Sequence, residues 1–184
     1  LVAKSVSQAL RKEAGLQRLY DELYLPLIPV LAEMENSGFD ISQKELKRLI
    51  EWYEEKRESM ETIVRHYPAL SKFFESHQHF NFSSYQQMAD LLYHTLKFPI
   101  IRKTAPSKTY PHGQASVAED TIRILKAGKG HLEVLNALLD RTKAKTILKT
   151  FLRVFESQTA VSQDGRLRTN YNLHVTETGR LSSS

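Results

Sequence analysis

The chain has 184 residues, of which 41% are hydrophobic and 26% charged, and it contains no cysteine. This length and apolar content suit one domain or two small ones with a buried core, and the many aliphatic and aromatic residues exclude an unfolded chain. The lack of cysteine excludes a disulfide scaffold, a thiolate zinc site and a cysteine nucleophile, and no apolar run is long enough to cross a membrane.

The net charge of +5 is unevenly distributed along the chain. Residues 1–140 hold 18 basic and 18 acidic residues, whereas residues 141–184 hold eight basic and three acidic ones. Between Lys97 and Lys129 there are seven basic residues and two acidic ones. Two basic regions on a neutral scaffold predict a phosphate-rich partner, which binds less tightly as salt rises. The alternative is that these charges only solvate helix surfaces.

The first predicted element is a helix over Leu16–Met34, because apolar residues recur there every three or four positions. Pro26 and Pro29 should kink or restart it, and Gly38 should end it in a left-handed conformation. A second long helix is expected over residues 42–66, opened by a capping-box sequence and carrying one apolar stripe. A short turn joins the two helices, so we expect them to pack antiparallel.

Two shorter helices and a last long one complete the helical part. We expect the first of them to begin at Ser83 or Ser84, and residues 102–114 to form a loop. A capping box at Ser116–Glu119 should open the next helix, and the last long helix is predicted over residues 131–155.

Near residue 160 the pattern changes from helical to alternating, which predicts a domain boundary. The pair Asp164-Gly165 is a turn signal, and polar residues alternate with others over residues 166–173. This pattern predicts one strand with a cationic face, formed by Arg166 and Arg168. A single strand cannot satisfy its own backbone, so its partners should come from residues outside the chain or from another molecule.

Four basic residues recur at every fourth position of the last long helix: Arg141, Lys145, Lys149 and Arg153. Each step turns about 40° around a helix, which predicts a slowly winding cationic ridge roughly 18 Å long. Such a ridge suits consecutive phosphates, although it could also be an ordinary solvated surface. His77 and His79 lack the further ligands of a metal site. The residues by themselves therefore predict binding and no active site.

Two C-terminal segments carry the most specific signal, Asp164–Asn172 and Thr178–Ser183. They resemble the beginning of the palm domain in family A DNA polymerases, the enzymes related to DNA polymerase I. Upstream, Phe80–Ser84 resembles the tip of the thumb domain in that family, and Arg141 with Lys145 resembles its helix along primer–template DNA. The resemblance covers residues 16–184.

The resemblance implies a mainly α-helical fold. The thumb would be a long antiparallel helix pair with a helical tip, and a short β segment at the C-terminal end would begin an incomplete palm. It divides the chain into the tail of a preceding exonuclease-like domain at residues 1–15, the thumb at 16–160 and the start of the palm at 161–184.

The resemblance also implies which residues bind DNA. The thumb tip would contact the DNA backbone, the last long helix would contact phosphates, and Arg180 would reach the minor groove near the primer end, where acceptor atoms are common to all base pairs. The cationic ridge and the cationic strand add three basic residues. The predicted DNA-binding residues are Asn81, Ser83, Ser84, Ser116, Arg141, Lys145, Lys149, Arg166, Arg168 and Arg180.

The activity implied is template-directed DNA synthesis by a monomer that uses deoxynucleoside triphosphates and Mg²⁺, away from membranes, in a bacterial or phage-infected cytoplasm or in an organelle. In the family the metal-binding aspartates follow the segment that resembles Thr178–Ser183. We therefore expect no catalytic or metal-binding residue in this chain and no polymerase activity of the chain alone. Two alternatives are a stand-alone helical nucleic-acid-binding module and a helical protein-interaction domain with an acidic partner.

Overall fold

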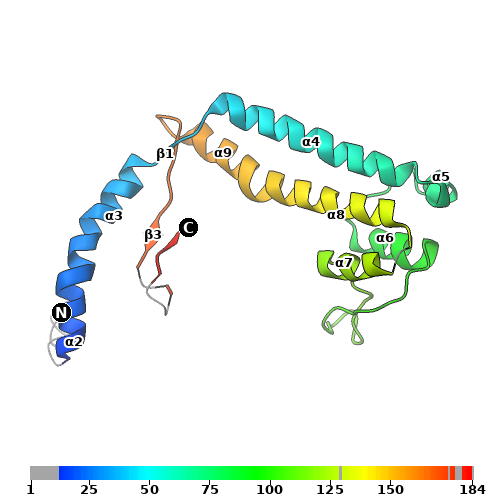
Figure 1. The fold of residues 1–184 in the computed structure, drawn as a ribbon, viewed down its shortest axis with the longest axis horizontal. Coiled ribbons are helices and arrows are strands. Elements are labelled where there is room, and N and C mark those ends of the chain that lie inside the picture. Colours follow the sequence, from blue (N-terminus) through cyan, green and yellow to red (C-terminus); the bar gives the residue numbers. More distant parts are fainter. Residues whose placement is uncertain (1–12, 129, 174, 177–179, 184) are drawn as a thin grey trace. The chain divides into compact units, whose positions relative to one another are not determined.

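The computed structural model describes residues 13–128, 130–173, 175–176 and 180–183 (Figure 1). These residues fall into two compact units. The helical unit comprises Gln43–Val154, and the terminal unit comprises the described residues before 43 and after 154. No helix among the described residues is long and apolar enough to cross a membrane. The structure is mainly helical with a few short antiparallel strands, which confirms the expected fold class.

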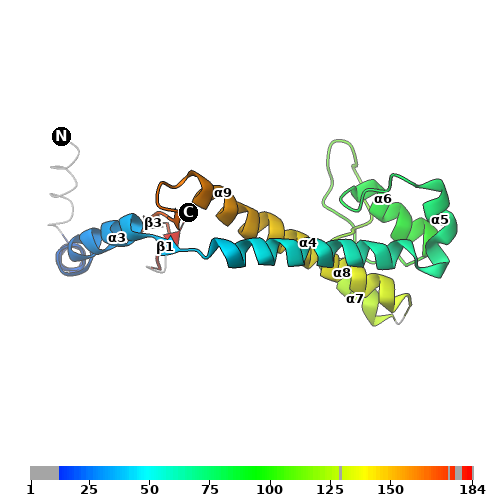
Figure 2. The same cartoon turned by 90° about the horizontal axis from the view of Figure 1, so that it is seen from above.

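The helical unit is built on a long antiparallel helix pair. Its elements are, in chain order, α4 (Gln43–Arg65), η2 (Pro68–Leu70), α5 (Ser71–Ser76), α6 (Tyr85–Ala89), η3 (Asp90–Thr95), α7 (Glu119–Ala127), α8 (Leu132–Ile147) and η4 (Leu148–Leu152). Helix α4 runs alongside α8 in the opposite direction (Figures 1 and 2). Helix α8 continues through the π-helical turn η4 into α9 (Arg153–Val161).

The expected long antiparallel pair is therefore present, but the partner of α4 is α8. The sequence pattern suggests instead the helix that precedes α4. The surface of α8 explains the difference, because it buries several leucines together with Ala137 and Ala144. Small residues between large ones allow the axes of two helices to approach closely and leave grooves for the side chains of the partner.

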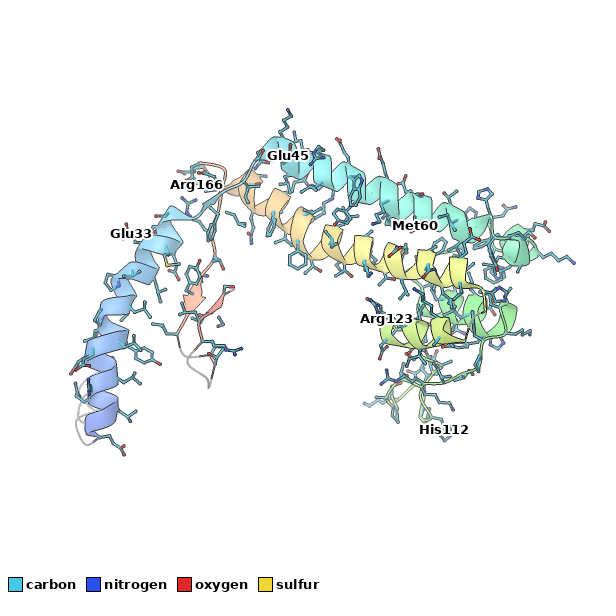
Figure 3. All side chains as sticks on the ribbon, viewed as in Figure 1. Glu33, Glu45, Met60, His112, Arg123 and Arg166 are labelled. Atoms are coloured by element: carbon cyan, nitrogen blue, oxygen red, sulfur yellow. The ribbon has the colours of Figure 1, made fainter. Side chains whose placement is uncertain are left out.

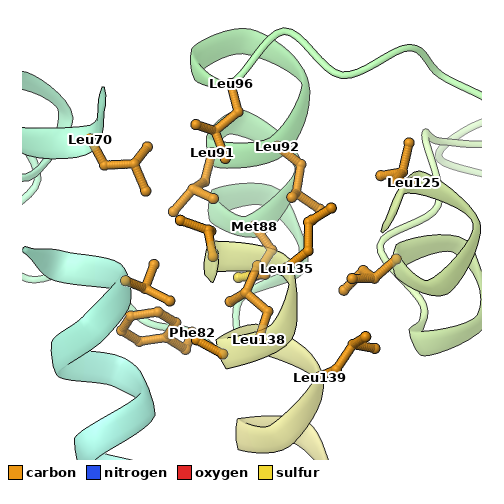
Figure 4. Close-up of a cluster of buried hydrophobic side chains, with 14 of the residues drawn as sticks. Leu70, Phe82, Met88, Leu91, Leu92, Leu96, Leu125, Leu135, Leu138 and Leu139 are labelled. Atoms are coloured by element: carbon orange, nitrogen blue, oxygen red, sulfur yellow. The ribbon is translucent and has the colours of Figure 1, made fainter. Parts of the chain in front are cut away.

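One end of the helical unit, which we call the tip, has a core of mainly leucine and phenylalanine side chains that lie between Val64 and Leu139 in the chain (Figure 4). Leu91 and Leu92 of η3 and Leu135 of α8 are fully buried. Around them, Phe73, Phe74, Phe80 and Phe82 contact one another, mainly edge to face. Each buried leucine or phenylalanine contributes about 1.5–3 kcal/mol relative to an exposed one. The tip is thus a packed platform, from which the loop between η3 and α7 extends, with His112 near its end (Figure 3).

Only one of the two expected serine caps forms at the tip. Ser84 caps α6, because its hydroxyl accepts a hydrogen bond from the backbone N–H of Gln87 at 3.4 Å. The capping box expected at Ser116–Glu119 is wrong, since the N-cap of α7 is Ala118. The Ser116 hydroxyl instead accepts hydrogen bonds from the Ala118 N–H and the Thr121 hydroxyl, so it closes the turn before the helix.

The terminal unit begins with a helix that contains a π-helical turn. Its elements are α2 (Ala14–Leu19), η1 (Tyr20–Tyr24), α3 (Leu25–Ser37), β1 (Phe39–Asp40), the end of α9, β2 (Arg166–Leu167), β3 (Tyr171–Asn172) and β4 (Ser182–Ser183). The N–H of Leu25 donates to the carbonyl of Tyr20, five residues earlier. Pro26 follows directly and Pro29 lies further along α3, and neither can donate a backbone hydrogen bond. The interruption expected at the prolines is therefore a change of helix type just before them.

The strands of the terminal unit find their partners within the chain. Strand β1 pairs antiparallel with β2, and β3 pairs antiparallel with β4. The expectations of one continuous strand over residues 166–173 and of partners outside the chain are therefore both wrong. Two side-chain contacts accompany the interruption: Arg168 donates to the carbonyl of Asn36, and the N–H of Tyr171 donates to the Glu35 carboxylate.

Gly38 allows β1 to approach β2. Its φ is +60°, and a Cβ at this position would lie 2.7 Å from the carbonyl oxygen of Leu167. Gly165 has a similar φ of +69°, but a Cβ there would meet no atom within 4 Å. A substitution at either glycine would therefore strain the backbone, but only one at Gly38 would also bring the new Cβ too close to another atom.

We expect Gly38→Ala to destabilise the β1–β2 pair by about 3 kcal/mol or more, because the strain of positive φ and the clash add. The matched variant Gly165→Ala should cost only the strain, about 1–2 kcal/mol. Amide hydrogen exchange at residues 39–40 and 166–167 measures both costs. Equal destabilisation by the two variants would contradict the idea that the close approach of Gly38 to Leu167 matters.

Candidate nucleic-acid interface

The centre of the candidate interface is the turn between Phe80 and α6, which we call the Asn81–Ser84 turn. The Asn81 side-chain oxygen accepts from the N–H of Ser83 at 2.8 Å, and its carbonyl accepts from the N–H of Ser84 at 2.9 Å. Gln87 accepts from the N–H of Asn81. The turn therefore has a fixed backbone, on which Asn81 and Ser83 are exposed while Phe82 is buried.

Arg141 of α8 joins this turn to α4. Its Nε donates to Oε1 of Glu61 at 2.9 Å, its Nη1 to the carbonyl of Phe82 at 3.2 Å and its Nη2 to the Ser83 hydroxyl at 3.4 Å. The guanidinium also lies over the Phe82 ring. Arg141 is only 9% exposed. Its charge is thus compensated within the protein by the Glu61 carboxylate.

Lys145 lies one helical turn after Arg141 and reaches the same hydroxyl. Its Nζ donates to Oγ of Ser83 at 3.0 Å. Lys145 is half-buried, whereas Lys149 is exposed on η4. Arg141, Lys145 and three residues of the Asn81–Ser84 turn, predicted separately from the sequence, are therefore brought together at one place.

The predicted ridge is not a row of four cations open to solvent. Arg153 forms an ion pair with Glu54 of α4, as Arg141 does with Glu61. Along the chain few acids lie near the ridge, whereas these two glutamates lie on the facing helix. The sequence does show that α4 is rich in acidic residues. Which basic residues they pair with can be deduced only once α4 is known to pack against α8.

Ser116 lies inside the tip. It is 8% exposed, and its carbonyl accepts a hydrogen bond from the Tyr93 hydroxyl. The Tyr85 hydroxyl donates to the neighbouring carbonyl of Ala115. Burial raises the pKa of the Tyr93 phenol, and Tyr85 adds to the rise, so the phenol stays protonated and remains a donor. The two tyrosines hold the segment before α7 on the helices of the tip.

Arg166 and Arg168 also have acidic partners. Arg168 forms two parallel hydrogen bonds with the Asp164 carboxylate, at 2.8 and 2.6 Å, and Arg166 pairs with Asp40 at 3.2 Å. Bidentate pairs of this kind fix geometry as well as adding energy. Arg168 therefore fixes the geometry of the turn after α9, and Arg166 forms an exposed ion pair across the β1–β2 pair. Arg180 is exposed, and its carbonyl accepts from the Thr176 hydroxyl.

Part of the most specific sequence signal lies outside the described residues. Residues 177–179, which include the Thr178-Gly179 pair before Arg180, are not described, and neither is residue 174. The geometry brings some of the predicted DNA-binding residues together. Because it contains no nucleic acid, the role of each of them stays a prediction.

Comparison with known protein families decides the kinship of the chain. Residues 43–184 match the family described as DNA polymerase family A. The chain belongs to this family. The match includes the whole helical unit and the C-terminal strands, which confirms the resemblance seen in the sequence.

Individual relatives agree with this assignment. The chain is 32% identical over 168 residues to DNA polymerase I of Caldicellulosiruptor bescii, a match that covers 91% of the chain and 18% of that protein. It is 31% identical over 182 residues to the thermostable DNA polymerase I of Thermus thermophilus, covering 98% of the chain and 20% of that protein. The chain thus spans about a fifth of the length of these curated relatives.

A solved structure shares the fold. The POL domain of Pol1 from M. smegmatis, in complex with DNA primer–template and dNTP, matches with a TM-score of 0.74 and 26% sequence identity. The match covers 98% of this chain and 28% of that one. The arrangement of helices described above is therefore one that a family A polymerase domain contains.

The ionised form of Asp164 is strongly favoured in this family A chain. Hydrogen bonds from Arg168 and then Ser162 hold the pKa of its carboxyl far below the ordinary value of an aspartate, with the N–H of Arg166 adding to the effect. A lowered pKa stabilises the fold at pH values above the unfolded-state pKa, about 3.9 for aspartate, and this contribution is lost as the pH falls below it.

We expect the Asp164 side-chain carbon to show no titration by NMR down to about pH 3, where an ordinary aspartate is mostly protonated. Acidification should weaken the β1–β2 pair in the natural chain more than in Asp164→Asn, which cannot titrate at this position. Amide hydrogen exchange between pH 6 and 3 checks the second statement. A midpoint near the ordinary aspartate value would contradict both.

Proposed function

We propose that this chain is the part of a DNA polymerase that binds primer–template DNA, through contacts to the backbone and the minor groove. The observation that carries the proposal is the convergence of Ser83 and Lys145 at the Asn81–Ser84 turn, in a chain of family A. The complex of the M. smegmatis relative with primer–template DNA supports the same conclusion.

The chemistry of the turn suits a phosphate ligand. An ammonium group and a hydroxyl 3.0 Å apart can both donate to the oxygens of one phosphate, and the exposed Asn81 amide offers further donors beside them. Such contacts position a duplex without reading its sequence. A polymerase needs this property, because it must hold any template.

We assign residues 16–160 to the thumb and residues 161–184 to the beginning of the palm. The helical unit, Gln43–Val154, lies wholly within this thumb, whereas the other described residues of the thumb belong to the same compact unit as the beginning of the palm. Arg180 would reach the minor groove at the primer end, and Lys149, Arg166 and Arg168 would add positive charge along the DNA. Residues 1–15 would belong to a preceding exonuclease-like domain.

The whole protein would carry out template-directed DNA synthesis. Its relatives are bacterial polymerases, so we place it in the cytoplasm of a bacterial or phage-infected cell, as a monomer that uses deoxynucleoside triphosphates. The family implies Mg²⁺ in the complete enzyme, which would activate the primer hydroxyl and stabilise the leaving pyrophosphate. The described residues contain no cluster of three or more His, Asp or Glu that fits a metal ion. In the family the metal-binding aspartates follow the segment that resembles Thr178–Ser183, so the Mg²⁺ ligands would come from other parts of the enzyme.

We expect the chain to bind primer–template duplex at low salt, with an affinity that falls as salt rises because bound phosphates release counterions. Lys145→Gln should lower the slope of log affinity against log salt by about 0.9, the value for one phosphate contact. Lys47→Gln, which removes an exposed lysine of α4, is the control and should leave the slope unchanged. Fluorescence anisotropy with a labelled duplex measures both.

The competing protein-interaction function makes a different forecast for the same assay. Binding to primer–template DNA at low salt that is no stronger than binding to polyglutamate would contradict the nucleic-acid function and favour an acidic protein partner.

We further expect the 184-residue chain alone to incorporate no nucleotide into a primer in the presence of Mg²⁺ and all four deoxynucleoside triphosphates, because the metal ligands would lie elsewhere. Primer extension on a sequencing gel checks this, with a complete family A polymerase as the positive control. Template-dependent extension by the purified chain would show that the assignment of its parts is wrong.

A further inference from the structure

The Ser83 hydroxyl accepts two hydrogen bonds from cationic side chains. Arg141 Nη2 lies 3.4 Å from its oxygen and Lys145 Nζ lies 3.0 Å from it. A serine oxygen has two lone pairs and one hydrogen. Because both lone pairs face the two cations, the hydrogen must point away from them. Ser83 is exposed, so its hydroxyl is oriented as a donor toward solvent.

Arg141 is held in place from the other side by Glu61. The side chain of Arg141 is 10% exposed and that of Glu61 is 24% exposed, with Nε and Oε1 2.9 Å apart. The same guanidinium donates to the carbonyl of Phe82, so it binds both the main chain and a side chain of the turn. These contacts use three of the five N–H bonds of the guanidinium. Because the side chain is only 10% exposed, the two remaining N–H bonds have little access to a ligand in solvent.

Lys145 is the cation that remains available at this place. Its ammonium group has three hydrogens and uses one on Ser83, which leaves two. A phosphate oxygen beside the turn could therefore accept from both the ammonium group and the Ser83 hydroxyl. Hydrogen bonds in which the acceptor is ionised are about twice as strong as neutral ones.

We propose that Glu61 and Arg141 are positioning residues, which fix the Ser83 hydroxyl as a donor to a DNA phosphate beside Lys145, and that Arg141 does not itself bind phosphate. The proposal rests on the proposed function, because it assumes that primer–template DNA occupies this surface. It differs from the role that the family resemblance implies for Arg141, which is a direct phosphate contact.

The variant Glu61→Gln separates the two roles of Arg141. If Arg141 positions Ser83, loss of the Glu61 charge loosens the guanidinium, and the affinity for primer–template DNA falls about threefold to tenfold. If Arg141 is a phosphate ligand that Glu61 restrains, the same change releases a cation and the affinity rises. The expected fall is opposite to the effect of removing a negative charge from a DNA-binding surface.

Glu54→Gln is the matched control. It makes the same charge change on the same helix, and Glu54 pairs with Arg153, which lies three helical turns beyond Arg141 along the chain. We expect its affinity to stay equal to that of the natural chain or to rise. Thermal unfolding followed by circular dichroism establishes that each variant is folded under the binding conditions.

A double-mutant cycle tests whether Glu61 acts through Ser83. Ser83→Ala should weaken binding and Ser83→Thr, which keeps the hydroxyl, should restore most of it. In the Ser83→Ala background, Glu61→Gln should have little further effect, because the donor that it positions is gone. A general loss of structure would instead weaken binding equally in both backgrounds.

Arg141→Gln gives a readout that does not depend on Glu61. Under the proposal it lowers the affinity and leaves the salt slope unchanged, whereas a direct phosphate contact would reduce the slope by about 0.9. A reduced slope, a rise in affinity with Glu61→Gln, or an equal effect of Glu61→Gln in both Ser83 backgrounds would each overturn the proposal. A natural chain that does not bind primer–template DNA at all would overturn the proposed function instead.

Discussion

The helical unit depends on a partly buried ion pair at the junction of its helices. Arg141 and Glu61 join α8 to α4, and the same arginine joins both helices to the Asn81–Ser84 turn. A buried arginine is costly unless its charge is compensated and its N–H groups are hydrogen-bonded. Here the carboxylate, a carbonyl, a hydroxyl and the Phe82 ring supply the partners. The geometry of the tip is therefore tied to the packing of the long helices.

This junction also separates two tasks that the sequence pattern assigns to one row of cations. Arg141 and Arg153 use their charges between the long helices, against Glu61 and Glu54. Lys145 and Lys149 have no such carboxylate partner among the ion pairs of the described residues. Arginine suits the interior task, because its planar fork makes several directed hydrogen bonds at once, whereas lysine is a flexible point charge.

Much of the fold could be predicted from the sequence because its signals are local. Apolar spacing of three and four indicates the helices α3, α4 and α8, and the residues around Arg180 are by themselves specific enough to indicate the family. The identity of the helix that pairs with α4 could not be predicted, because it depends on how two stripes fit one another. Strands β1 and β4 are two residues long, too short to give a periodic pattern.

The candidate site could be predicted in composition but not in connectivity. Asn81, Ser83, Arg141 and Lys145 are all indicated by the sequence, in two groups far apart along the chain. The structure joins these groups through the Ser83 hydroxyl and the Phe82 carbonyl. In the sequence Glu61 resembles its solvated neighbours, since only a tertiary contact distinguishes it from them. For the same reason, the local sequence does not show that Ser116 is buried, because its hydrogen-bond partner Tyr93 lies 23 residues away.

The π-helical turn η4 has a consequence for comparing this helix with its relatives. The N–H of Arg153 donates to the carbonyl of Leu148, five residues earlier, so the turn holds one residue more than an α-helical turn. Every side chain after Leu152 is rotated about 100° from the direction that continuous α-helical numbering assigns to it. Some relatives could have a helix without the additional residue. In such a helix, the residue that takes the place of Arg153 opposite α4 would lie one position away from the one that a gap-free alignment pairs with Arg153. Basic residues on either side of η4 should therefore be compared by their place in space.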